Sequence, residues 1–201
     1  MGRGDAGGGL AADAADIRSE YNTLSPDESI VEVQWGERMT SNETKHQSKT
    51  ICTSCWAVHT VAMTCQDDFY QMLYWEQELM AEGMNLMDVH FLMVACYHMQ
   101  HPHLYSSETL IEIRRNVAEF LKGRRNIDDI RRKTGEAARS DRRKHKITGY
   151  DGNHGGYATP VQWTMRAMDV VAAGKDQYVV SVRRWAKSVI AALEDVEVVA
   201  R

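Results

Sequence analysis

The sequence has few cysteines, no long apolar run and no strong net charge, and each of these shortages excludes a class of protein. Four cysteines among 201 residues are too few for a small secreted domain held together by disulfides. No apolar run approaches the roughly 20 residues that a membrane-spanning helix needs. The N-terminal sequence lacks the apolar core of a signal peptide. A net charge of -4 indicates no particular partner, so we expect a soluble, cytoplasmic protein that has no membrane partner.

Common catalytic fingerprints are also missing from the sequence. It contains neither a phosphate-binding loop nor a dinucleotide-binding fingerprint. No serine lies within the glycine pattern of a nucleophile elbow. Any chemistry must therefore come from residues outside these motifs.

The sequence does contain a concentration of residue types that bind metals. All four cysteines and four of the eight histidines lie between residues 52 and 101. Two residues separate Cys52 from Cys55, a spacing that lets both sulfurs reach one ion from a tight turn. Cys65 supplies a third sulfur, and thiolates suit zinc well. We predict a zinc site; buried reduced thiols and redox chemistry are the alternatives.

Helix geometry indicates a fourth ligand. Apolar residues recur at three- and four-residue steps over 65–80 and again over 89–101, which predicts two helices. If these helices are antiparallel, the end of the second lies beside the cysteines. His101 is therefore the predicted fourth ligand, with His98 as its substitute. The alternative for His101 is a helix-end histidine that bonds to a free carbonyl group.

The same geometry places His90 near Glu76. His90 and His101 share a helix face but are three turns apart, about 16 Å, so they cannot bind one ion from a straight helix. Glu76 and His90 are predicted to form either a buried polar pair of the core or part of a second site for acid–base chemistry. His154 is a further catalytic candidate, in a glycine-rich loop.

The overall pattern predicts an all-α fold, a bundle of five or six helices without a convincing sheet. Residues 30–35 alternate in polarity and could form a short strand or dock on the core. We expect a mobile, acidic and glycine-rich arm over residues 1–47. Residues 48–201 are expected to form a single helical domain, with a glycine-rich loop over 151–157.

Several residues mark predicted helix ends. Gly83 follows the first long helix as a C-terminal cap. Ser106 or Ser107 caps a third helix. Thr159 and Pro160 resemble the N-cap and first position of another helix.

Residues 122–146 are the most basic part of the chain. We predict that this segment forms a weakly buried helix followed by a polar connection. A solvated surface, neutralised by the acidic arm, is one interpretation, and contact with an anionic partner is the other. The segment has no aromatic residue for base stacking, which disfavours single-stranded nucleic acid. A homo-oligomer is also compatible with the sequence.

Three sequence blocks are similar to a known family. They are the Cys-x2-Cys head, the run from Gln100 through His101 and Pro102 to Leu104, Tyr105 and Ser106, and the segment Val182-Arg-Arg-Trp-Ala-Lys-Ser-Val189. Over residues 50–195 the chain resembles an uncharacterised bacterial family of unknown function. The resemblance implies a small helical protein, often with a Cys-x2-Cys head, and it implies no known reaction.

Two departures from that family pattern stand out. The family tends to place glycine after the second cysteine, where this chain has Trp56. Glycine permits the left-handed backbone that a zinc-binding turn uses. The family also often has histidine where this chain has Tyr70 and Phe91, so a site that relies on those histidines is absent or altered here.

Two functions follow from these residues. The first is a zinc-stabilised helical domain that acts as a binding or regulatory module. The second is a metal-dependent enzyme, with iron as the alternative metal, that acts on a small molecule. The enzyme hypothesis requires several side chains to converge on a pocket between helices, with the glycine-rich loop as a lid. These residues are Glu76, His90, Tyr97, His101 and His154.

Overall fold

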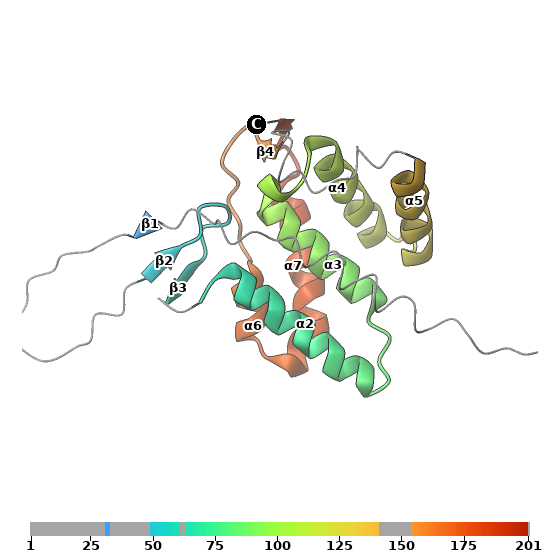
Figure 1. The fold of residues 1–201 in the computed structure, drawn as a ribbon, viewed down its shortest axis with the longest axis horizontal. Helices are drawn as coiled ribbons and strands as arrows, with labels where there is room; N and C mark the ends of the chain where they lie inside the picture. The colour runs from blue at the N-terminus through green and yellow to red at the C-terminus, as the bar shows by residue number, and fades with distance from the viewer. Residues whose placement is uncertain (1–30, 33–48, 61–62, 141–153, 201) are drawn as a thin grey trace, which may run out of the picture.

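The structure is a computed structural model that describes residues 31–32, 49–60, 63–140 and 154–200. The described chain is mostly helical (Figure 1). Its elements in chain order are β1 (Val31–Glu32), β2 (Lys49–Ile51), β3 (Val58–Thr60), α2 (Cys65–Ala81), α3 (Met87–Gln100), η1 (Pro102–Leu104), α4 (Ser107–Leu121), α5 (Ile127–Ser140), β4 (Gly155–Tyr157), α6 (Ala167–Ala172), η2 (Lys175–Gln177), α7 (Tyr178–Ala192) and β5 (Val198–Ala200).

The prediction of a mostly helical chain is confirmed, but a purely all-α bundle is not what the structure contains. The antiparallel strands β1, β2 and β3 form one small sheet, and β4 pairs with β5 in another. Each strand has only two or three residues. Such strands are too short to give a recognisable alternation of polar and apolar residues. The strand candidate at residues 30–35 is present as β1.

Helices α2 and α3 form the predicted hairpin (Figure 1). Thr64 begins α2 with a capping box, in which its hydroxyl accepts from the backbone N–H of Asp67 and the Asp67 carboxylate accepts from the backbone N–H of Thr64. Gly83 follows the helix with φ of +92°, a conformation that glycine adopts without a steric cost. The chain then returns along α3, which ends one residue before His101.

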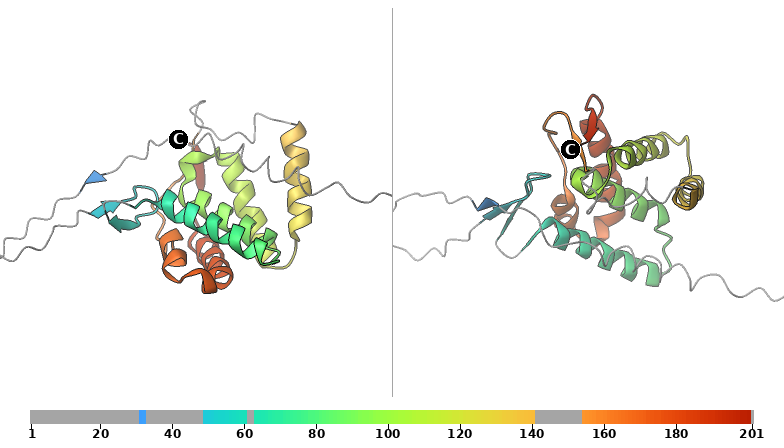
Figure 2. Two further views of the ribbon diagram at one scale, coloured as in Figure 1. Left: turned by 60° about the horizontal axis from the view of Figure 1, so that its bottom comes forward. Right: turned by 45° about the horizontal axis from the view of Figure 1, so that its top comes forward.

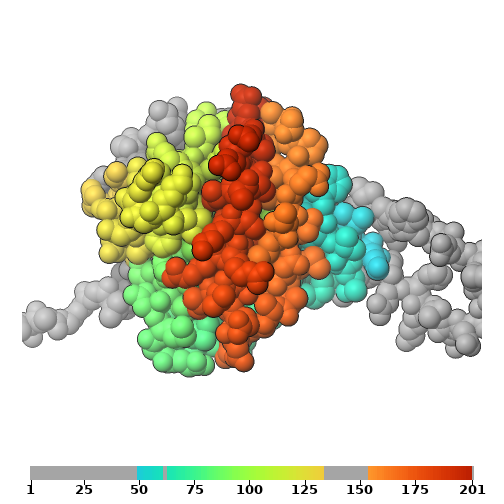
Figure 3. All heavy atoms as spheres, turned by 180° about the vertical axis from the view of Figure 1, so that it is seen from behind, coloured from blue at the N-terminus to red at the C-terminus, as the bar shows by residue number. Residues whose placement is uncertain are grey.

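The core lies where α3 packs against α7 and α4. In the space-filling view from behind, α7 and β5 form a band between the segment that holds β4 and α6 and the segment that holds α4 and α5 (Figure 3). Gln100 is fully buried there and crosslinks two parts of the chain. Its amide donates to the carbonyl oxygen of Met165 at 2.8 Å, and its Oε1 accepts from Trp185 Nε1 at 3.3 Å.

The three-stranded sheet lies on one side of the helical body, away from α5 (Figures 1 and 2). This placement puts the connection between β2 and β3 beside the start of α2 and the end of α3. The sheet therefore brings the N-terminal cysteine pair to the helix hairpin.

Two predictions for the second half of the chain need correction. Ser106 caps α4 as predicted, but Thr159 and Pro160 do not open a helix. Helix α6 begins only at Ala167, because the chain before it continues from β4, with Ala158 N–H bonded to the Glu197 carbonyl oxygen.

The predicted loop at residues 151–157 is also partly wrong, since its last three residues form β4. The cause is close packing at Gly155, which donates its N–H to the carbonyl oxygen of Tyr105 at 2.7 Å. A Cβ atom at this position would lie 2.3 Å from Leu110 Cδ1. The glycine therefore permits close approach of two segments.

Several predictions fall outside the described residues. They concern the arm over residues 1–47 apart from β1, the end of the basic segment after residue 140, and the first part of the glycine-rich loop. The described part of the basic segment contains α5, which buries Ile130 against the rest of the protein. In the part of the chain that the structure describes, no helix is both long and apolar enough to cross a membrane.

Candidate metal centre

The first two cysteines lie in a tight turn between β2 and β3. Cys52 donates its N–H to the carbonyl oxygen of Ala57 at 2.9 Å, and Trp56 donates its N–H to the carbonyl oxygen of Cys52 at 2.9 Å. Trp56 has φ of 62°, the left-handed conformation that such a turn needs. The residue after Cys55 thus adopts this turn conformation although it is not glycine.

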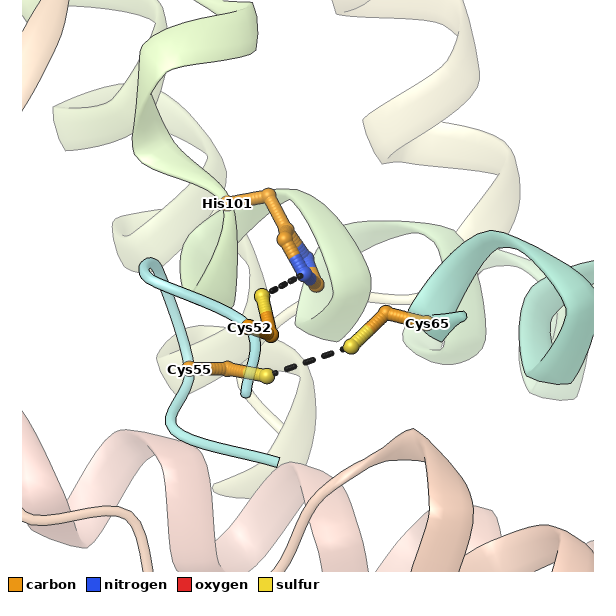
Figure 4. A group of neighbouring side chains, drawn as sticks. All are labelled: Cys52, Cys55, Cys65 and His101. Atoms are coloured by element: carbon orange, nitrogen blue, oxygen red, sulfur yellow. Dashed lines mark hydrogen bonds between the residues drawn. The ribbon is translucent and has the colours of Figure 1, made fainter. Parts of the chain in front are cut away.

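The other two members of the cluster come from the helix hairpin. Cys65 is the first residue of α2, and His101 directly follows α3. Figure 4 shows the three sulfurs and the imidazole turned toward one another. One ligand atom from each of the four residues, Cys52, Cys55, Cys65 and His101, lies within 4.8 Å of every other.

The distances in this cluster are close to those of a tetrahedral zinc centre. Cys52 Sγ lies 3.6 Å from His101 Nε2, and Cys55 Sγ lies 3.4 Å from Cys65 Sγ. Zinc–sulfur bonds of about 2.3 Å in a tetrahedron separate two sulfurs by roughly 3.8 Å. These two pairs therefore lie within a few tenths of an ångström of the separations in such a centre, and the remaining pairs lie within 4.8 Å.

Burial differs among the members of the cluster. Cys55, Cys65 and His101 are almost completely buried, whereas Cys52 is partly exposed. Because the cluster is largely buried, any charge on its thiols or its imidazole must be balanced by an opposite charge nearby.

His101 is held in one orientation by its backbone neighbour. Its Nδ1 donates to the carbonyl oxygen of Tyr97 at 2.8 Å, and its ring stacks on the Tyr97 ring with centroids 4.2 Å apart. Because Nδ1 carries this hydrogen, the lone pair of the neutral ring is on Nε2, which faces Cys52. A metal-binding histidine is commonly oriented in this way.

The protonation states of the residues in the cluster depend on one another. Hydrogen bonds from Cys55 and Cys65 lower the pKa of Cys52. Burial alone would lower the pKa of His101, but hydrogen bonds with Cys52 and Cys55 raise it to about 10. Hydrogen bonds with Cys52 and Cys55, together with burial, raise the pKa of Cys65. Three neighbouring thiols cannot all ionise together unless a cation offsets their charge.

Two residues beside the cluster were missed by the sequence analysis. His59 Nε2 lies 3.3 Å from Cys65 Sγ, and Arg166 Nε donates to the carbonyl oxygen of Cys55 at 2.7 Å. His59 reaches this position because it pairs with Thr50 in the β2–β3 register. The sequence carries a histidine six residues before Cys65 but no signal for that register.

His98, the predicted substitute ligand, is not part of the group. Its ring makes edge contacts with Tyr97 and Tyr105 and lies near Phe69. Burial, with the charges of His101 and another nearby histidine, lowers the pKa of His98 to about 3, so it is a neutral core residue.

Glu76 and His90 form the predicted pair. His90 Nδ1 lies 2.6 Å from Glu76 Oε2, and Tyr178 donates its hydroxyl to Glu76 Oε1 at 2.7 Å. Glu76 is buried, and each of its two carboxylate oxygens has a partner in the interior. Eleven residues of helix, roughly 16 Å, separate it from Cys65, so this pair is distinct from the cysteine cluster.

A cavity of about 590 Å³ lies beside the cluster. Two residues of the cluster, Cys52 and Cys65, form part of its wall. None of the described residues that line it is Asp, Glu, Lys or Arg; the polar part comes mainly from hydroxyl and imidazole groups. The lining includes the imidazoles of His59, His103 and His154.

Of the proposed catalytic residues, only His154 reaches this cavity. Its Nδ1 donates to the carbonyl oxygen of His103 at 2.8 Å, which joins the start of β4 to η1. Glu76 and His90 do not line the cavity. Their catalytic role stays a prediction.

Comparison with known proteins gives one match. No curated protein and no solved structure is similar enough to indicate an activity. Residues 50–194, however, match a described family of unknown function, DUF5946. This range contains all four residues of the cluster and agrees with the resemblance seen in the sequence. The chain is therefore a member of the family of unknown function DUF5946.

Proposed function

We propose that this chain is a zinc-binding helical domain in which one ion is held by Cys52, Cys55, Cys65 and His101. The observation that supports this most directly is the meeting of four ligand atoms from three separate segments within 4.8 Å. Three thiolates and one imidazole form a soft donor set that suits tetrahedral zinc. The oriented His101 ring is consistent with the same role.

The proposed ion is structural. Four protein ligands complete a tetrahedral shell, whereas a catalytic zinc keeps one position open for water or substrate. An ion here would join the turn between β2 and β3 to the start of α2 and the end of α3. Binding of zinc to such sites in small peptides releases about 10–16 kcal/mol, which becomes folding free energy. The domain would then serve as a binding or regulatory module whose fold depends on zinc.

Elemental analysis of the purified protein tests this proposal. We expect one zinc per chain in the wild type and a large loss of zinc in Cys55→Ala. The matched control is Cys96→Ala, which removes a buried cysteine of α3 outside the cluster. It should keep its zinc. A strong chelator should lower the unfolding temperature of the wild type sharply.

The zinc proposal fails if Cys55→Ala and Cys96→Ala contain the same amount of metal. It also fails if the wild type contains no zinc after growth in zinc-supplemented medium. Iron in place of zinc would retain the ligand set and change the metal.

The cavity beside the cluster favours a second candidate function, a metal-dependent enzyme acting on a small molecule. Cys52 is the partly exposed ligand and lies in the cavity wall, so a substrate could replace it. The visible spectrum of the cobalt-substituted protein distinguishes the two functions. Added azide or imidazole should leave the spectrum of a closed site unchanged and should alter that of an open site.

A further inference from the structure

Asp68 lies close to the cluster, and the environment of its carboxylate is unusual. Its side chain is only 5% exposed, and among the described residues its Oδ2 has no hydrogen-bond partner. A buried carboxylate oxygen without a partner is costly and calls for an explanation. The nearest basic group is the Nδ1 atom of His59, which lies 3.9 Å from that oxygen.

His59 connects Asp68 to the sulfur of Cys65. Its Nε2 lies 3.3 Å from Cys65 Sγ, while the opposite ring nitrogen faces Asp68. His59 is itself buried, with 7% of its surface exposed. The three residues come from β3 and from the first turn of α2, so they form a row from the carboxylate to the cluster.

The charge of the proposed zinc centre gives this row a role. Three thiolates exceed the charge of one divalent ion, so the centre keeps an excess negative charge in a buried place. An N–H donor to a thiolate spreads that charge. A thiolate only accepts hydrogen bonds, so the imidazole must carry a hydrogen on Nε2.

We propose that His59 and Asp68 are positioning residues of the metal centre, in which the carboxylate fixes the imidazole and the imidazole donates an N–H···S hydrogen bond to the Cys65 thiolate. This inference rests on the proposed zinc function. The 3.9 Å between His59 Nδ1 and Asp68 Oδ2 is longer than a hydrogen bond, so the proposal requires the two groups to approach by about 1 Å in the metal-loaded centre, where one hydrogen lies between them. Histidine ligands often have such an outer carboxylate; here the arrangement serves a sulfur ligand.

Neighbouring histidines do not share this arrangement. His103 also lines the cavity, but its Nδ1 contacts Ser54 Oγ at 3.3 Å. It is exposed, and its contact is with a hydroxyl group. His103→Leu therefore removes a cavity imidazole without removing the row to Cys65.

The test uses the full chain loaded with Co²⁺, together with zinc affinity measured by chelator competition. His59→Leu should weaken zinc binding about 10- to 100-fold, the usual effect of losing an outer partner. It should also move the sulfur-to-cobalt charge-transfer band to longer wavelength, because an unbonded thiolate gives up its electron more easily. His59→Gln, whose amide can still donate, should restore much of both properties. His103→Leu should resemble the wild type.

Asp68→Asn provides the second arm of the test. The variant should shift the same band by a smaller amount, and this shift should vanish in a His59→Leu background, because Asp68 acts only through His59. If His59→Leu does not fold, His59→Phe, which keeps a ring and has no N–H donor, serves as the background.

The outcomes separate the two proposals. A wild type that binds neither Zn²⁺ nor Co²⁺ overturns the zinc function and this inference with it. A wild type that binds both, with His59→Leu and Asp68→Asn giving the wild-type affinity and band position, overturns only the role of His59 and Asp68. Equal weakening by His103→Leu and His59→Leu also contradicts it.

Discussion

His101 donates its Nδ1 hydrogen to the carbonyl oxygen of Tyr97 one helical turn earlier, at 2.8 Å. The Tyr97 carbonyl oxygen also accepts the backbone N–H of His101 at 3.0 Å, and the side-chain bond directs Nε2 toward the cysteines. The alternative from the sequence, a helix-end histidine bonded to a free carbonyl group, is therefore met only in part: His101 bonds a carbonyl group at the end of α3, but that group already accepts a backbone N–H. One side chain ends the helix and faces the cluster.

We predict that His101→Gln retains more zinc affinity than His101→Asn. The glutamine amide can place an oxygen near the position of Nε2, whereas the shorter asparagine amide lies near Nδ1. Both variants should bind zinc more weakly than the wild type, by more than the roughly 10-fold that loss of an outer partner costs. Competition with a colorimetric chelator measures the affinities. Equal affinity of His101→Asn and the wild type would show that Nε2 is not a ligand.

Trp56 provides a prediction about backbone strain. It has φ of 62° and is the only residue other than glycine with positive φ among the described residues. Trp56→Gly should be more stable than Trp56→Ala by about 1 kcal/mol, because glycine adopts this conformation without a steric penalty. Since Trp56 is 55% exposed, both variants lose similar and limited burial.

Thermal unfolding of the zinc-loaded Trp56 variants measures this difference. The alanine variant is the control, since it removes the indole ring and keeps the strain. If the two variants unfold at the same temperature, the left-handed turn is not strained.

The buried Glu76 carboxylate should depend on Tyr178. Tyr178→Phe removes the hydroxyl that donates to Glu76 Oε1 and leaves that oxygen unsatisfied in the core. We expect a loss of about 1–3 kcal/mol in the free energy of unfolding. Tyr74→Phe, on an exposed part of the same helix as Glu76, should change it by less than about 0.5 kcal/mol. Urea unfolding at pH 7.5 compares them, and equal effects would contradict the role of the hydroxyl.

The close approach at Gly155 leads to a further prediction. A Cβ atom would lie 2.3 Å from Leu110 Cδ1 and 3.1 Å from the Tyr105 carbonyl oxygen. Gly155→Ala should therefore cost about 1–3 kcal/mol through overpacking. In a Leu110→Ala background the additional cost should be smaller, because the main obstacle is gone. Urea unfolding of the four proteins gives the coupling, and full additivity would argue against the contact.

His98 should make stability depend on pH. Burial lowers its pKa to about 3 in the folded protein, from about 6.5 in the unfolded chain. Between these values only the unfolded chain binds the proton, so stability falls as the pH falls from about 6.5 toward 3. At pH 5.5 the loss is about 1.4 kcal/mol relative to neutral pH.

His98→Phe removes this titration and keeps an aromatic ring among Phe69, Tyr97 and Tyr105. Urea unfolding at pH 7.5 and pH 5.5, with zinc in excess, should show a smaller decrease for the variant. The difference between the two decreases should be about 1.4 kcal/mol. Parallel decreases in both proteins would mean that His98 does not stay neutral in the fold.

Much of the cluster could be predicted because its geometry depends on regular elements. The Cys-x2-Cys spacing defines a turn, and the helical periodicity on both sides of Gly83 fixes how far α3 returns along α2. Together they place His101 beside Cys65. The Glu76–His90 pair follows from the same count.

The missed features depend on contacts between distant segments. His59 reaches Cys65 only through the register of strands three residues long, which no periodicity reveals. The pairing of β4 with β5 likewise depends on packing at Gly155. Thr159 and Pro160 carry a local helix-start signal, but the chain there extends from β4 and tertiary contacts determine its course.

Helix α7 is translated after all four ligands of the cluster, yet two interior groups rely on it. Tyr178 supplies the hydroxyl that Glu76 accepts, and Trp185 supplies the N–H that Gln100 accepts. A nascent chain lacking α7 already contains the three thiols and the imidazole of the cluster, but Glu76 on α2 and Gln100 on α3 do not yet have these donors. Synthesis of the four cluster residues therefore precedes synthesis of the helix against which α3 packs.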